Sequence, residues 1–206
     1  MSQLRTYPFA FALLAITLLY NVAEGVIAIA SGLRAGSLVL LSFGADSYLE
    51  VLAAAAVMWR LSYRDEEAGE RADGKALRFI GLTFLTLAAA VVFPAAFALA
   101  AREGASESRI GIALLTASLV IMPVLALAKV RTAAKSNLHA LAAEAKETVA
   151  CSYLSLTALA GLLATAIFGA WWIDSLAALL MVPWLVREGL EGIRGDACFD
   201  GAKTCS

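Results

Sequence analysis

Two pairs of side chains that can bind a metal ion, each pair spaced four residues apart, lie inside long apolar stretches. Asp46 and Glu50 form the first pair, and Glu147 and Cys151 form the second. Residues four apart share one face of an α-helix, with Cβ atoms about 5–6 Å apart. An ionisable residue inside a membrane helix costs about 2.5–3.5 kcal/mol on insertion scales, so it marks a functional site by default. Two such helices would together supply four ligands.

The ligand types narrow the choice of metal ion. Three carboxylates and one thiolate in a tetrahedral arrangement suit Zn²⁺. The thiolate argues against Mg²⁺ and Ca²⁺, which prefer oxygen ligands alone. The same donors also accept Cd²⁺, Co²⁺, Ni²⁺ or Fe²⁺, so the pattern predicts a divalent transition metal, with Zn²⁺ as the first choice among them.

The four ligands also predict an exchange of metal for protons. Burial and like-charge repulsion both favour the protonated forms of neighbouring acids, so the metal-free cluster must hold protons. A divalent cation binds only deprotonated ligands, and its binding therefore releases protons. This competition is the physical basis of a metal/proton antiporter, in which protons are the counter-ion.

The composition sets the fold class that must position these residues. Of the 206 residues, 61% are hydrophobic and only 16% are charged, whereas charged residues make up about 25% of soluble domains. Apolar stretches of about 18 residues or more predict membrane-spanning helices. We therefore expect an all-α integral membrane protein within the lipid bilayer. The chain has no basic patch with interleaved aromatic residues, which argues against nucleic-acid binding, and no nucleophile–base pattern, which argues against an enzyme.

Six membrane-spanning helices can be read from the apolar pattern. They are expected near residues 8–30, 37–59, 79–101, 110–127, 141–170 and 171–185. We expect residues 1–195 to form one transmembrane domain and residues 196–206 to form a short tail. The tail carries Cys198 and Cys205, and it either captures metal or is disordered.

Lys and Arg residues lie mainly on one side of these predicted helices. That side includes Arg60, Arg71 and Lys129, whereas the other side has only Arg34, Arg102 and Arg109. Cytoplasmic loops carry an excess of Lys and Arg. The asymmetry predicts a multi-pass protein of the plasma (inner) membrane with both termini in the cytoplasm.

The chain resembles the transmembrane domain of the cation diffusion facilitators, the cation efflux family of zinc/proton antiporters. That family has a pair of metal ligands four residues apart in its second helix, which matches Asp46-Ser-Tyr-Leu-Glu50 with Glu in place of the usual Asp. The family's fifth-helix motif, Ala-Asp-Ala-x-His-x-x-x-Asp, falls on residues 143–151. Glu147 stands there in place of His, and Cys151 in place of Asp. The resemblance covers about residues 10–195.

This resemblance implies a six-helix bundle, a homodimer and a divalent metal ion as substrate. The family's soluble metal-binding domain is missing, which suggests a subgroup with the transmembrane domain alone. The expected function is a proton-coupled antiporter that exports a divalent transition metal, zinc first, from the cytoplasm. The alternative is a membrane metal sensor or assembly partner that retains the metal site without transporting.

Several further polar residues are candidates for accessory roles. Glu24 in the first helix, with Asn21 one turn earlier, could lie beside the site as a proton relay or an outer metal ligand, or could fix that helix against its neighbours. Glu144 is either an acid at the cytoplasmic mouth or a solvated residue at a helix end. His139 is the only histidine, and we expect it to face solvent. We expect Asp174 to cap the N-terminus of the last helix rather than to bind metal.

Overall fold

The protein is described by a computed structural model that covers residues 8–61, 66–102, 106, 108–136 and 138–194. Six α-helices follow one another along the chain. They are α1 (Pro8–Ala35), α2 (Leu38–Arg60), α3 (Glu66–Ala101), α4 (Arg109–Ser136), α5 (His139–Phe168) and α6 (Ile173–Arg194). The all-helical fold class predicted from the sequence is confirmed for these residues.

Each helix lies where the apolar pattern predicts one, and several extend beyond it. α3 begins at Glu66 and α4 continues to Ser136, because polar residues extend these helices beyond their apolar stretches. Helices α1 to α5 each contain a stretch long and apolar enough to cross a membrane. α6 is not among them, since Arg187 and Glu188 interrupt its apolar run. The chain therefore has the make-up of a membrane-embedded helical protein.

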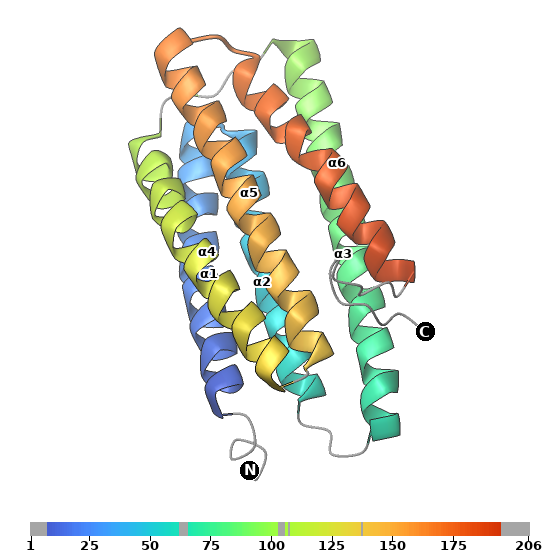
Figure 1. The fold of residues 1–206 in the computed structure, drawn as a ribbon. Coiled ribbons are helices and arrows are strands. Elements are labelled where there is room, and N and C mark those ends of the chain that lie inside the picture. The colour runs from blue at the N-terminus through green and yellow to red at the C-terminus, as the bar shows by residue number, and fades with distance from the viewer. Residues whose placement is uncertain (1–7, 62–65, 103–105, 107, 137, 195–206) are drawn as a thin grey trace.

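Consecutive helices run in opposite directions, so α1 begins at the same end of the bundle at which α2 and α4 finish (Figure 1). We call this end the basal end. The closest packing is between α1 and α2, between α4 and α5, and between α3 and α6. Helices α1, α2, α4 and α5 form one group, and α3 and α6 pair with each other beside it and pack against α2 and α5 (Figure 1).

Glycines allow α1 and α2 to approach each other closely at the middle of their crossing. A Cβ atom on Gly25 would lie 3.2 Å from the carbonyl oxygen of Gly44, and one on Gly44 would lie 3.0 Å from the Cβ of Ala28. Small residues allow this kind of approach between membrane helices. The crossing places Glu24 of α1 beside Ser47 of α2, whose hydroxyl donates a hydrogen bond of 3.1 Å to the carboxylate.

Asp174 joins α6 to α2 at the end opposite the basal end. Its carboxylate accepts hydrogen bonds of 2.5 Å from the Ser37 hydroxyl and 2.7 Å from the Leu38 backbone N–H. These groups belong to the N-terminus of α2, where backbone N–H groups lack partners within the helix. The sequence-based assignment of Asp174 as the cap of its own helix is therefore wrong, because its oxygens cap α2 instead.

The glycine crossing can be tested with Gly44→Val. Its added side chain would meet Ala28 and Ile29 of α1, and overpacking of this kind costs about 1–3 kcal/mol. We expect a lower free energy of unfolding for the purified protein in detergent. Ala55→Val, at an exposed position of the same helix, is the control and should leave stability nearly unchanged. Equal stability of the two variants would contradict the close crossing.

Candidate functional site

Lys129 of α4 lies at the centre of a buried group of polar residues. Its side chain is 0% exposed. The ammonium nitrogen Nζ lies 2.6 Å from Oε1 of Glu144, 2.6 Å from Oγ1 of Thr148 and 3.4 Å from Oε1 of Glu50. An ammonium group has three hydrogens to donate, and these three acceptors from α2 and α5 match them.

Thr148 connects the two carboxylates that surround this ammonium. Its hydroxyl accepts the hydrogen bond from Lys129 and donates one of 2.5 Å to Oε1 of Glu50. Glu50 comes from α2, Lys129 from α4, and Glu144 and Thr148 from α5. Three helices are therefore joined by charge-assisted hydrogen bonds, which are stronger than those between neutral groups.

Asp46 and Cys151 extend this group toward the middle of the bundle. Both side chains are buried. The Cys151 thiol lies beside the carboxyl groups of Asp46 and Glu50, and it is a free cysteine. The structure thus brings together three of the four residues that the sequence predicts as metal ligands.

Glu24 adds a carboxyl group from a fourth helix, α1. It accepts hydrogen bonds of 3.0 Å from the Tyr20 hydroxyl and 3.1 Å from the Ser47 hydroxyl. Ser118 of α4 also lies beside it, and shares a 3.0 Å hydrogen bond with Ser155 of α5. These hydrogen bonds hold α1 against α2, as expected if Glu24 fixes the first helix against its neighbours. Glu24 also remains close to the other acids.

These residues form one continuous group, which we call the polar cluster. Its members are Glu24, Asp46, Glu50, Lys129, Glu144, Thr148 and Cys151. Four of them carry carboxyl groups that are at most 5% exposed, and one carries an ammonium group. If every acid were ionised, one cation would face four anions, and buried charges without partners are very costly. Protons or bound cations must therefore compensate the surplus.

Several buried polar atoms in and beside the polar cluster lack a hydrogen-bond partner within the part of the chain that the structure describes. Among the described residues, the buried atoms without a partner include Oε2 of Glu50, Oε2 of Glu144 and both polar atoms of the Asn21 side chain. Asn21 is 0% exposed and lies on the same face of α1 as Glu24. Unpartnered buried polar atoms are rare in proteins. Here the two glutamate oxygens are free to accept a proton or a cation.

Glu147 holds a different place from that of its predicted partner Cys151. The buried face of α5 runs through Glu144, Thr148 and Cys151, and Glu147 lies on its half-buried flank. It remains close to Glu144, Glu50 and Asp46. Within the described ranges, no three His, Cys, Asp or Glu side chains are arranged to hold a metal ion. The four-ligand site of Asp46, Glu50, Glu147 and Cys151 stays a prediction.

The structure also decides between the two predicted settings of Glu144. A solvated residue at a helix end is excluded, because Glu144 is 1% exposed and bonded to Lys129. It lies five residues after the start of α5, which is about 8 Å along the helix from the basal end. The predicted tail ligands Cys198 and Cys205 lie outside the described residues, as does the side chain of His139.

Sequence reasoning missed Lys129 and Thr148. It assigned Lys129 to a cytoplasmic loop, and this is wrong because the residue lies inside α4 and is buried. A signal was present in the spacing, since Leu115, Met122 and Lys129 stand seven residues apart and all three lie on the buried face. Residues at this spacing share one face of a helix. A lysine in register with core residues points inward, where it needs acidic partners.

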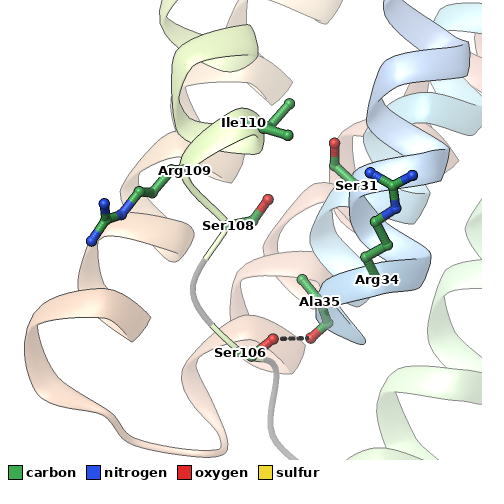
Figure 2. Close-up of a pocket in the computed structure, with 7 residues that line it drawn as sticks. All are labelled: Ser31, Arg34, Ala35, Ser106, Ser108, Arg109 and Ile110. Carbon is green, nitrogen blue, oxygen red and sulfur yellow. Dashed lines mark hydrogen bonds between the residues drawn. The ribbon is translucent and has the colours of Figure 1, made fainter.

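A separate cavity of about 280 Å³ lies near the opposite end of the bundle, where α1 ends and α4 begins (Figure 2). Its lining consists of Ser31, Arg34, Ala35, Ser106, Ser108, Arg109 and Ile110. Arg34 lies over the side of the cavity near Ser31, and the Ser106 hydroxyl donates a 3.1 Å hydrogen bond to the carbonyl oxygen of Ala35 (Figure 2). Among the described residues, the lining offers hydroxyl and guanidinium groups.

No protein-family model and no curated protein sequence matches the chain. The resemblance to cation diffusion facilitators therefore depends on the motifs quoted from the sequence.

Replacement of Lys129 by Met tests whether its ion pairs with Glu50 and Glu144 stabilise the fold. The variant leaves Glu50 and Glu144 without their cation, and removal of one partner from a buried ion pair costs about 3–5 kcal/mol. We expect a loss of this size in the free energy of unfolding. The double variant Lys129→Met/Glu144→Gln should lose less than the sum of the single variants.

Lys135→Met is the matched control, because Lys135 is an exposed lysine in the last turn of the same helix. We expect it to change stability by less than about 0.5 kcal/mol, as surface substitutions usually do. If Lys129→Met were as mild as Lys135→Met, the buried ion pair would be refuted.

Proposed function

We propose that this protein is a proton-coupled antiporter that exports a divalent transition metal, with Zn²⁺ as the first candidate, from the cytoplasm. One observation carries the proposal: among the described residues, buried carboxyl groups outnumber buried ammonium groups inside a bundle in which five helices are long and apolar enough to cross a membrane. In this proposal all six helices span the plasma (inner) membrane, both termini are cytoplasmic and the protein acts as a homodimer.

The surplus of acids suits an exchanger, because two kinds of positive charge can neutralise it. Protons on the carboxyl groups give one neutral state, and a bound divalent cation gives another. The two states exclude each other at the same oxygens. Import of protons on one side of the membrane can then drive release of the metal ion, provided that the site opens to each side in turn.

The positions of the acids along the bundle suggest a route for the ion. Glu144 lies near the basal end, which the charge pattern assigns to the cytoplasm. Asp46, Glu50 and Cys151 lie farther along their helices from the basal end, at which α2 ends and α5 begins. Glu24 is eleven residues from the far end of α1, which is about 16 Å. We place entry of the metal at Glu144 and binding at Asp46 and Glu50. Rocking of the helices around this fixed site would give alternating access.

The thiol of Cys151 supports a transition metal over an alkaline-earth ion. It lies beside Asp46 and Glu50, where thiolate and carboxylate ligands together suit Zn²⁺. Glu147 would be the fourth ligand in this proposal, which requires its half-buried side chain to turn toward Asp46 and Glu50.

A second candidate function is a membrane metal sensor or assembly partner that binds without transporting. The contacts of Lys129 with Glu50 and Glu144 favour it, because they stabilise the bundle when no metal is bound. A transporter must break such contacts in every cycle, whereas a sensor breaks them only once on binding. Binding without flux across a membrane would favour this second function.

Asp46→Asn tests the transport function. The amide keeps the size of the side chain but cannot carry the negative charge that a metal ligand needs, so we expect loss of metal-driven proton flux in proteoliposomes. Zn²⁺, Cd²⁺, Co²⁺ and Fe²⁺ should each be applied to the wild type. The control is Glu191→Gln, which removes a carboxylate outside the polar cluster, paired with the exposed Arg187, and should retain flux. Metal efflux retained by Asp46→Asn would refute the assigned site.

Cys151→Ser tests the choice of metal. Serine keeps the shape of the side chain but offers a harder, neutral donor, so soft ions should lose more than hard ones. We expect the ratio of Cd²⁺ to Co²⁺ flux to fall by about tenfold, with the fold intact by circular dichroism. An unchanged ratio would show that the thiol does not touch the ion.

The exchange also predicts how metal affinity depends on pH. Metal ligands must be deprotonated before they bind, so acidification should weaken Zn²⁺ binding by the purified protein. Calorimetric titrations at pH 7.5 and 6.0 measure this, and buffers of different ionisation enthalpy report the released protons. An affinity that does not vary with pH would argue against exchange.

A further inference from the structure

We propose that Lys129 is a tethered cation, which occupies the polar cluster while no metal ion is bound and releases Glu50 when a divalent ion arrives. This proposal depends on the proposed function, because it assigns to Lys129 the role of setting the affinity and the charge selectivity of the proposed divalent-metal site. Its basis is the set of contacts made by the buried ammonium group.

The three contacts of this ammonium are unequal. Nζ lies 2.6 Å from the oxygens of Glu144 and Thr148, but 3.4 Å from Oε1 of Glu50. Charge-assisted hydrogen bonds of this kind are usually about 2.7–2.9 Å long. The contact with Glu50 is therefore the weakest of the three. Lys129 can give it up while it keeps both partners on α5.

Each of the two carboxylates beside Lys129 has one oxygen without a hydrogen-bond partner among the described residues. Oε2 of Glu50 and Oε2 of Glu144 are buried and have no hydrogen-bond partner in the described part of the chain. One ammonium thus neutralises the pair only in part. An ion that reached Glu50 would find Oε2 already free. At Oε1 it would compete with Lys129 and with the hydrogen bond that the Thr148 hydroxyl donates.

Charge then decides which ions can displace the lysine from Glu50. The metal ion and the ammonium would lie within a few ångströms of each other, where like charges repel strongly in a poorly solvated interior. A monovalent cation brings no more charge than the ammonium group that it must replace. A divalent cation brings twice as much, so Lys129 selects for divalent ions and at the same time weakens their binding.

The test is Zn²⁺ binding to the full chain in detergent, measured by calorimetry for the wild type, Lys129→Met and Lys129→Arg. The methionine has a similar shape without the charge, so we expect it to bind Zn²⁺ about tenfold more tightly or better, because a competing cation has been removed. The arginine keeps the charge and should bind within about threefold of the wild type. Lys135→Met, exposed on the same helix, is the control for the net charge of the protein.

If Lys129→Met does not fold, the same comparison can be made on a Glu144→Gln background. The double variant Lys129→Met/Glu144→Gln should bind Zn²⁺ more tightly than Glu144→Gln alone. Equal affinities of the two would overturn the proposal.

The outcomes separate this proposal from the function on which it depends. Tighter binding by Lys129→Met, with Lys129→Arg and Lys135→Met close to the wild type, supports the tethered cation. Wild-type affinity in Lys129→Met overturns the tethered cation and leaves the antiporter intact. Absence of Zn²⁺ binding in every form, the wild type included, overturns the metal site and this proposal with it. Flux lost in Asp46→Asn tests the antiporter separately.

Discussion

A buried lysine that faces more acids than it can neutralise is the constraint on which the rest of the structure depends. Lys129 enters the core from α4, where Glu50 of α2 and Glu144 of α5 meet it. Desolvation of these charges is expensive, and only close pairing offsets it. Any arrangement of these three helices that separated the ammonium from both carboxylates would leave buried charges alone. The polar cluster therefore determines how α2, α4 and α5 face one another.

The packing of the helices around the polar cluster also positions its residues. The glycine crossing of α1 and α2 places Glu24 within a hydrogen bond of Ser47, so a fourth helix joins the polar cluster. At the opposite end of the bundle, Asp174 of α6 accepts hydrogen bonds from the N-terminus of α2 and holds it in place. α2 is thus held at its N-terminus by α6 and at its middle by α1, and this positions Asp46 and Glu50. α3 and α6 pack against α2 and α5 rather than against α1 and α4.

The sequence was sufficient to predict the helices, but it predicted only part of the site. Long apolar runs predict helices by length and hydropathy alone, which is why all six helices lie where they were expected and five of them are long and apolar enough to cross a membrane. Spacing also placed Asp46 and Glu50 on one face of α2, because residues four apart share a helix face. That Cys151 of α5 lies beside them was expected from the resemblance to the cation efflux family, in which the two helices share one metal site. The pairing of Lys129 with Glu144 was not predicted, since it depends on how α4 packs against α5. Spacing within one helix carries no information about the rotation of its neighbour. For the same reason spacing could not show that Glu144, rather than Glu147 one turn later, is the acid of α5 that bonds to the ammonium.

The central claim is that protons and a divalent metal ion compete for the same buried carboxylates. The most direct measurement adds Zn²⁺ to the purified protein in weakly buffered solution and follows the release of protons and the binding of metal together. We predict protons released in a fixed ratio to bound Zn²⁺ by the wild type, and a smaller ratio in Asp46→Asn. Binding of Zn²⁺ with no release of protons would contradict the exchange, and the polar cluster would then be a metal-binding or purely structural element.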